Sequence, residues 1–215
     1  MPVKLIMFDL DGTLVDTVQD ITNALNYALK PYGIKSLSVS DTMKMVGEGI
    51  SRLVEKVLSA KKFHLKNDVI KRFLEYYSEH LTDNSREYPY VAETLEHLAK
   101  FKKAIISNKR EDLSKKILEY FDLARYFDLI IGSDTTGEKK PSAVPLLYVI
   151  SQLGISPEES IIVGDSEYDI EAGKRAFTKT IAVTYGYRPR ESLAEADYVI
   201  DDLRELIPLL DKISK

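Results

Sequence analysis

Residues 3–13 of the sequence read VKLIMFDLDGT. The first six of these residues are mostly apolar, and the run is short and bounded by polar residues, which is typical of a buried β-strand. Two carboxylates, Asp9 and Asp11, follow at once, together with Gly12 and Thr13. We therefore expect a strand that carries acidic side chains directly at its carboxyl end.

Similar short runs recur along the rest of the chain. They lie at residues 103–107, 127–131, 160–164, 180–183 and 198–200. Between them, apolar residues repeat at helical spacing, as at Leu113, Ile117, Leu118 and Phe121. Strands that alternate with helices predict an α/β fold with a doubly wound, mostly parallel, Rossmann-like sheet that has helices on both faces.

Residues 16–82 break this alternation, because no strand-like run stands out there. Amphipathic patterns predict three helices instead, at residues 18–28, 50–58 and 69–77, the last with Asn67 as its N-cap. The sequence thus predicts an α/β core formed by residues 1–15 and 83–215, and a helical insertion formed by residues 16–82.

The composition is that of an ordinary globular enzyme. The 215 residues are 44% hydrophobic and 30% charged, with a net charge of −4 and no long basic run, which argues against a nucleic-acid partner. The absence of cysteine excludes disulfides, a thiolate nucleophile and a cysteine-ligated zinc site. No apolar stretch suits a signal peptide or a membrane span. We expect a cytoplasmic chain without a membrane partner, either a monomer or a homodimer.

Polar side chains follow the predicted strands at the point where each strand ends. They are Asp9, Asp11, Gly12 and Thr13 after the first strand, Ser107 and Asn108 after the second, Lys139 and Lys140 beyond the third, and Asp165 and Asp169 after the fourth. In an open parallel sheet, ligands bind beyond the carboxyl ends of the strands. The fold would therefore bring these groups to one edge.

Four carboxylates gathered at one edge would repel one another. Two unit charges about 4 Å apart interact by about 4 kcal/mol at an effective dielectric of about 20. A divalent cation and a lysine would offset this repulsion, and oxygen ligands without His or Cys favour magnesium. Gly12 lets the backbone approach a phosphate closely, and Ser107 and Asn108 precede a helix that begins near Asp112, so their polar groups can face an anion.

Simpler explanations exist for some of these residues. Asp165 and Asp169 are also residue types of turns and helix caps, and Ser107 could cap the helix that follows it. A calcium-binding loop fits Asp9 and Asp11 poorly, because such a loop has glycine at its sixth position whereas Gly12 would stand at the fourth.

The motifs resemble those of the haloacid dehalogenase superfamily. Residues 9–16 are similar to its first signature, Ser107 to its second, Lys140-Pro141 to its third and residues 164–169 to its fourth. The four signatures occur in the family's order, and the resemblance covers nearly the whole chain. It implies that the helical insertion is a cap domain that closes over the sheet edge.

The resemblance also implies a role for each acidic residue. Asp9 would be the nucleophile that forms an aspartyl-phosphate, and Asp11 the general acid and then the general base. Mg²⁺ would be bound by Asp9, by the main-chain carbonyl of Asp11 and by Asp165, with Asp169 supporting these ligands.

The phosphate group would meet the remaining motif residues. These are Gly12, Thr13, Ser107, Asn108 and Lys140. Lys140 is preferred to Lys139 because the family places its lysine directly before proline; Lys139 is the alternative.

Residues 46–53 are similar to the cap loop of the phosphoglycolate phosphatase and β-phosphoglucomutase branch. Arg52 in this stretch could bind a second anionic group of the substrate, or could be an exposed helix arginine. That branch usually has glycine at the positions of Tyr90 and Phe177, and Ala143 replaces a frequent proline. These departures lie away from the proposed chemistry.

Asp11 favours phosphate-ester chemistry, because the dehalogenase branch does not carry Asp at this position. We expect an Mg²⁺-dependent phosphatase for a small phosphorylated metabolite, with 2-phosphoglycolate as the first candidate. The alternatives are a sugar phosphomutase of the β-phosphoglucomutase kind, a pyrophosphatase or nucleotidase of the same superfamily, and a catalytically silent binding protein.

Overall fold

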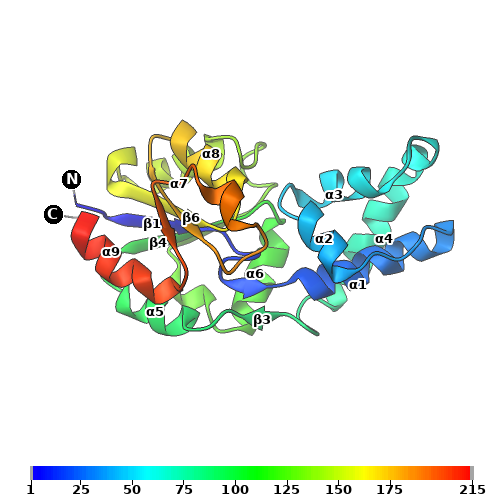
Figure 1. The fold of residues 1–215 in the computed structure, drawn as a ribbon, viewed down its shortest axis with the longest axis horizontal. Coiled ribbons are helices and arrows are strands. Elements are labelled where there is room, and N and C mark those ends of the chain that lie inside the picture. Colours follow the sequence, from blue (N-terminus) through cyan, green and yellow to red (C-terminus); the bar gives the residue numbers. More distant parts are fainter. Residues whose placement is uncertain (1, 214–215) are drawn as a thin grey trace.

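The computed structural model describes residues 2–213, and six strands in that range form one sheet (Figure 1). They are β1 (Leu5–Phe8), β4 (Lys102–Ile106), β5 (Leu129–Ile131), β6 (Ser160–Gly164), β7 (Lys179–Val183) and β8 (Tyr198–Ile200). Their order across the sheet is β5-β4-β1-β6-β7-β8, and each neighbouring pair is parallel. The predicted α/β fold with a Rossmann-like sheet is confirmed.

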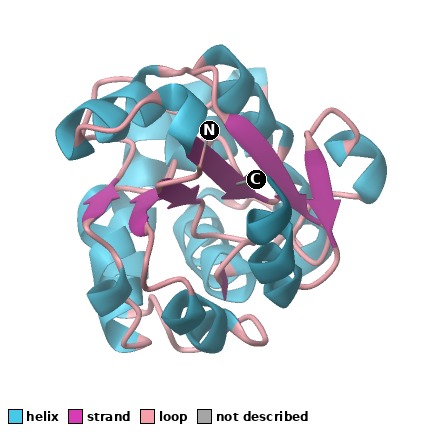
Figure 2. Ribbon diagram, turned by 90° about the vertical axis from the view of Figure 1, so that its left-hand side faces the viewer, coloured by secondary structure: helices cyan, strands magenta, loops and turns pink. Residues whose placement is uncertain are grey.

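Helices cover both faces of this sheet, which lies between two helical layers (Figure 2). One face carries α5 (Val91–His97), α6 (Glu111–Tyr120) and α9 (Leu206–Ile213), and the other carries α7 (Val144–Leu153) and α8 (Glu167–Arg175). Successive side chains of a strand point to opposite faces, so Ile6 and Phe8 pack in the first layer and Leu5 and Met7 in the second. Strand β1 is thus buried on both sides.

The predicted helical insertion forms four helices beside the carboxyl edge of the sheet (Figure 1). They are α1 (Val18–Leu29), α2 (Val39–Met45), α3 (Gly49–Val57) and α4 (Lys66–Glu79). Buried apolar residues such as Leu25, Val54 and Phe73 hold these helices together. The residue numbers proposed for the domain boundaries stay a prediction. In residues 2–213, no helix is both long and apolar enough to cross a bilayer.

Two short strands join the insertion to the sheet domain. Strand β2 (Val15–Asp16) pairs antiparallel with β3 (Arg86–Glu87), so the outgoing and returning segments of the chain lie side by side. Close by, the buried carboxylate of Asp20 accepts hydrogen bonds from the main-chain N–H groups of Asn84 and Ser85. A two-residue strand is too short to show a period in the sequence, which explains why this pair was not predicted.

The prediction that Asn67 caps a helix is wrong. A 3₁₀ helix at Ala60–Leu65 runs directly into α4, and Leu65 already has helical backbone angles, φ −81° and ψ −4°. An N-cap residue normally has an extended backbone that starts a new helix. Here the chain is already helical before Asn67, which lies inside the first turn.

Tyr90 and Phe177 stand at positions where the resembling branch usually has glycine, and both have a left-handed backbone conformation. Tyr90 has φ 65° and Phe177 has φ 59°. A non-glycine residue in this conformation costs about 1–2 kcal/mol, because its Cβ approaches a carbonyl oxygen. The guanidinium of Arg204 lies 3.5 Å from the ring centroid of Tyr90, whereas the Phe177 side chain is 80% exposed. Phe177 therefore carries backbone strain with little packing to offset it.

We predict that Phe177→Gly stabilises the protein by about 0.5–1 kcal/mol. Removal of the left-handed strain outweighs the greater backbone entropy that glycine gives the unfolded chain. Urea denaturation should show a higher midpoint. Tyr120→Gly, at the exposed aromatic residue that ends α6 and has no left-handed backbone, is the matched control and should not raise the midpoint. A lower midpoint for Phe177→Gly would contradict the argument.

Candidate active site

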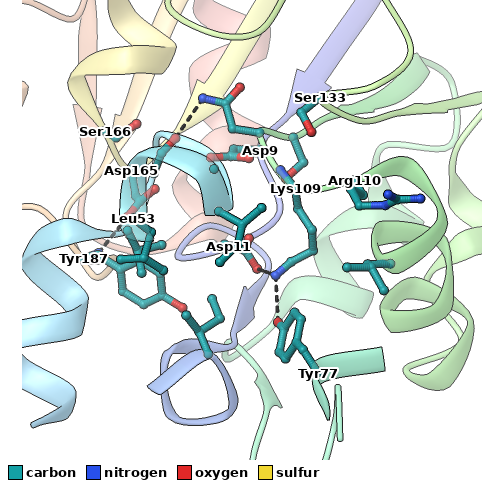
Figure 3. Close-up of a pocket in the computed structure, with 18 of the residues that line it drawn as sticks. Asp9, Asp11, Leu53, Tyr77, Lys109, Arg110, Ser133, Asp165, Ser166 and Tyr187 are labelled. Atoms are coloured by element: carbon teal, nitrogen blue, oxygen red, sulfur yellow. Dashed lines mark hydrogen bonds and ion pairs between the residues drawn. The ribbon is translucent and has the colours of Figure 1, made fainter. Parts of the chain in front are cut away.

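A cavity lies between the carboxyl edge of the sheet and the helices of the insertion (Figure 3). The sheet side is polar: its lining includes Asp9 and Asp11 after β1, Ser107 and Asn108 after β4, and Asp165 and Ser166 after β6. The side formed by the insertion is mostly apolar: its lining includes Ile21, Ile50, Leu53, Phe73 and Leu74. The structure thus brings polar residues from three strand ends together in a cavity that apolar residues of the insertion cover.

Asp9 lies at the point where the strand order reverses, between β1 and β6. Its Oδ1 accepts a hydrogen bond from the N–H of Leu10 at 2.7 Å and lies 2.9 Å from the Nζ of Lys140. Burial raises the pKa of Asp9 to about 7, because the opposing charge of Lys140 only partly compensates and Asp169 adds to the rise. Asp9 is therefore a largely buried carboxylate in a crowded site.

Asp165 is a second buried carboxylate in this site. Burial is the largest effect on it, and together with the charges of Asp9 and Asp169 it holds the pKa of Asp165 well above the usual range. Its Oδ2 accepts a hydrogen bond from the N–H of Tyr187 at 2.7 Å. Gly12 has φ 83°, and a Cβ at this position would lie 2.3 Å from the same oxygen. Only glycine fits against Asp165 there.

The arrangement of carboxylates fits a divalent cation with oxygen ligands. One oxygen from each of Asp9, Asp165 and Asp169 lies within 4.8 Å of the others. Such a hard donor set suits Mg²⁺, and a cation would offset both the burial of charge and the repulsion that together raise the pKa values of Asp9 and Asp165. Asp169 already accepts hydrogen bonds from Lys140 at 2.6 Å and from the hydroxyl of Ser166 at 2.6 Å. This geometry suits the supporting role predicted for Asp169.

Several of the predicted phosphate-binding residues are buried near Asp9. Ser107 and Asn108 line the cavity, and the Nδ2 of Asn108 donates to the carbonyls of Gly47 and Lys140, both at 2.8 Å. The side-chain oxygen of Asn108 and the hydroxyl of Thr13 are buried without a hydrogen-bond partner among residues 2–213. Buried polar atoms of this kind are normally satisfied by water or a ligand.

Asp11 is held by two neighbours that its sequence motif did not suggest. Its Oδ1 lies 3.0 Å from the Nζ of Lys109 (Figure 3). The same oxygen lies 2.6 Å from the hydroxyl of Thr17. Lys109 also donates to the phenolic oxygen of Tyr77 on α4, at 2.8 Å. Burial acts to lower the pKa of Lys109, but the charge of Asp11 and the bond to Tyr77 outweigh it and raise that pKa. Its position directly after Ser107 and Asn108 was the available sequence signal.

Lys139 and Arg52 do not join these residues. Lys139 donates to the carbonyl of Glu48 in the loop before α3. The Arg52 side chain is 58% exposed, pairs with Glu55 at 2.6 Å and is not among the residues that line the cavity. Helix α3 turns Leu53 towards the cavity and leaves Arg52 facing solvent, and a contact between Arg52 and substrate stays a prediction.

The loop after β7 adds two residues that the sequence did not single out. The hydroxyl of Tyr187 accepts from the N–H of Thr17 at 2.8 Å. Arg188 donates to the carbonyls of Met43, at 3.0 Å, and of Val46 at the end of α2. Tyr187 therefore connects the sheet domain to the segment that leads into the insertion, and Arg188 connects it to the end of α2 in the insertion. Their place after a strand end was the only sequence signal.

Known proteins resemble this chain over almost its whole length. A family model described as haloacid dehalogenase-like hydrolase matches residues 6–183. A phosphoglycolate phosphatase from Aquifex aeolicus is 43% identical over 97% of this chain and 97% of its own length. Another from Chromobacterium violaceum is 38% identical over 97% of this chain and 96% of its own length. The crystal structure of a predicted phosphoglycolate phosphatase from Haemophilus somnus has a TM-score of 0.89 at 30% identity, covering 96% of this chain and 97% of that one.

We predict that a divalent cation stabilises the folded protein through Asp165. The pKa of Asp165 is higher in the folded than in the unfolded state, so its ionised form costs folding free energy at neutral pH. Asp165→Asn should therefore be more stable than the parent in metal-free buffer, because it removes the cost of burying this charge. Mg²⁺ at about ten times its Kd should stabilise the parent by about 1.4 kcal/mol, and the variant by much less.

Thermal unfolding with EDTA and with MgCl₂ measures both effects. Asp68→Asn, at an exposed position on α4, is the control and should respond to Mg²⁺ as the parent does. An equal rise in Tm for the parent and Asp165→Asn would contradict the assignment.

Proposed function

This chain belongs to the haloacid dehalogenase-like hydrolases and is a phosphatase, and we propose that it hydrolyses 2-phosphoglycolate with the aid of Mg²⁺. The observation that carries the proposal is the position of Asp9. This carboxylate lines the cavity at the end of β1, next to the buried ammonium of Lys140 and the buried carboxylate of Asp165. The relatives that carry the name phosphoglycolate phosphatase support the choice of substrate.

In the first step, a carboxylate oxygen of Asp9 attacks the phosphorus atom of the ester. The bond from phosphorus to the ester oxygen breaks, and Asp11 gives its proton to the departing oxygen, so that the alcohol leaves as glycolate. Lys140, the hydroxyl of Ser107 and the main-chain N–H of Asn108 hold the phosphoryl oxygens. These groups are fixed by burial before the substrate arrives, which lowers the cost of charge development in the transition state.

In the second step, water attacks the phosphorus atom of the aspartyl-phosphate. Asp11, now a carboxylate, accepts a proton from that water, and the bond between phosphorus and the Asp9 oxygen breaks. Inorganic phosphate leaves, Asp9 is again a carboxylate and Asp11 again carries its proton. One residue serves as acid and then as base, so the enzyme returns to its starting state.

Asp9, Asp165 and the main-chain carbonyl of Asp11 would hold Mg²⁺ in this site, with Asp169 fixing their orientation through Lys140 and Ser166. When bound, the cation supplies charge neutralisation and orientation for the phosphoryl oxygens. The apolar residues of the insertion would exclude water from the ester while it is cleaved.

We predict that Asp9→Asn lowers kcat by at least about 10³-fold, because the amide keeps the shape of the side chain but is not a nucleophile. Phosphate release from 2-phosphoglycolate measures the effect, and the exposed Asp68→Asn serves as the control for substitution of an aspartate. An Asp9→Asn enzyme that turns over at nearly the parent rate would overturn the mechanism.

The same assay separates hydrolysis from phosphomutase activity. We expect inorganic phosphate to be released from 2-phosphoglycolate without interconversion of glucose 1-phosphate and glucose 6-phosphate. Isomerisation of the sugar phosphates with little release of phosphate would replace the proposal with the mutase.

A further inference from the structure

We propose that Lys109 recognises a carboxylate on the alcohol part of the substrate, and that Tyr77 of the insertion holds Lys109 in place for this contact. This inference rests on the proposed function, since it concerns the same cavity and the same ester. It identifies the feature that would let the site select an ester of a 2-hydroxy acid over a simple alkyl phosphate.

The chemistry of the ester places its carboxylate close to Asp11. In an ester of a 2-hydroxy acid, the carboxyl carbon is two bonds from the ester oxygen, so a carboxylate oxygen lies within about 4 Å of it. Asp11 must reach that ester oxygen over about 2.7 Å to transfer a proton. A partner for the carboxylate must therefore lie within a few ångströms of Asp11. The Nζ of Lys109 lies 3.0 Å from the Oδ1 of Asp11.

The other cations around the cavity already have different partners. Arg188 is engaged by the carbonyls of Met43 and Val46, and its Nε lies 3.2 Å from Glu167. The Nε of Arg110 lies 3.0 Å from Asp112, and the side chain is 47% exposed. Among residues 2–213, neither guanidinium forms an ion pair with Asp11.

Two other lysines of this region contact groups other than Asp11. Lys140 lies between Asp9 and Asp169, on the phosphate side of the site. Lys139 donates to the carbonyl of Glu48. Of the cationic side chains among residues 2–213 that line the cavity, Lys109 is thus the one that contacts Asp11.

The surroundings of Lys109 suit recognition of a negative charge. Its side chain is only 6% exposed, and the apolar Phe73 and Leu113 line the same cavity. A carboxylate that enters this space loses water, so an ammonium at hydrogen-bond distance matters more there than at an exposed position. An ammonium has three hydrogens, and Asp11 and Tyr77 engage two of them. Lys109 can therefore bind the substrate without leaving Tyr77.

Tyr77 belongs to helix α4 of the insertion, whereas Lys109 follows β4 of the sheet domain. The hydroxyl of Tyr77 accepts from the Nζ of Lys109 at 2.8 Å, and the ammonium lies 4.8 Å from the ring centroid (Figure 3). The contact aims the ammonium into the cavity only while the insertion covers the sheet edge. Tyr77 is therefore a positioning residue for Lys109.

The test compares 2-phosphoglycolate with ethyl phosphate, which has the same carbon chain but no carboxylate. For each enzyme, kcat/KM is measured with both esters and the ratio of the two values is taken. Lys109→Met keeps the length of the side chain and removes its charge. We expect this ratio to fall by about 10- to 100-fold, the worth of one hydrogen bond between charged groups. Lys109→Arg, which keeps the charge, should retain part of the preference.

Two further variants make the result specific. Lys71→Met removes a 75% exposed lysine of α4 that does not line the cavity, and it should leave the ratio unchanged. Tyr77→Phe removes one hydroxyl and should lower the ratio by about 3- to 10-fold, with most of the change in KM for 2-phosphoglycolate. If Lys109→Met does not fold, the ratio measured for Tyr77→Phe still tests the inference.

The outcomes separate this inference from the proposed function. If the parent prefers 2-phosphoglycolate and Lys109→Met has the same ratio as the parent, Lys109 does not bind the carboxylate and the inference is overturned while the substrate stands. If the parent itself hydrolyses ethyl phosphate as well as 2-phosphoglycolate, the proposed substrate is overturned, and the inference with it.

Discussion

The crowding of buried carboxylates around a single lysine is the constraint on which the site depends. Asp9 and Asp169 both bond to the Nζ of Lys140, at 2.9 and 2.6 Å, and Asp165 lies beside them. Burial is the largest cause of the raised pKa values of Asp9 and Asp165, and one ammonium does not neutralise three carboxylates, so their mutual repulsion adds to the rise. Natural proteins keep such unfavourable arrangements where a ligand relieves them, and here a divalent cation would do so.

The fold brings the carboxylates together at the sheet edge, and the insertion covers that edge. Parallel strands β1 and β6 end side by side at the point where the strand order reverses, so the residues that follow them meet. The insertion is held over this edge by its main chain, because Arg188, Asn108 and Lys139 donate to the carbonyls of Val46, Gly47 and Glu48. Asn108 also lines the cavity, so a residue at the proposed phosphate site is bonded to the loop that covers it.

Much of this structure could be predicted from local sequence pattern. The six strands of the sheet are short apolar runs, and the polar residues that follow them mark the edge where ligands bind. The residues that pattern did not reveal act through distant contacts: Lys109 meets Tyr77 across 32 positions and Tyr187 meets Thr17 across 170. For Arg52 the sequence left two interpretations open, a substrate contact or an exposed helix arginine, because the direction of a helical side chain depends on packing; in the structure Arg52 is exposed and paired with Glu55. Local pattern therefore locates the chemistry, while tertiary packing decides which side chains surround it.

The central claim is that Asp9 carries the phosphoryl group during turnover. An acyl phosphate can be reduced by borohydride, which converts the aspartate to homoserine. Turnover of 2-phosphoglycolate quenched rapidly with borohydride, followed by mass spectrometry of the peptide that contains residues 9–11, locates the modified side chain. The account predicts homoserine at position 9 and unmodified Asp11, with neither residue modified in the absence of substrate. Modification of Asp11, or of neither residue under conditions of full turnover, would contradict it.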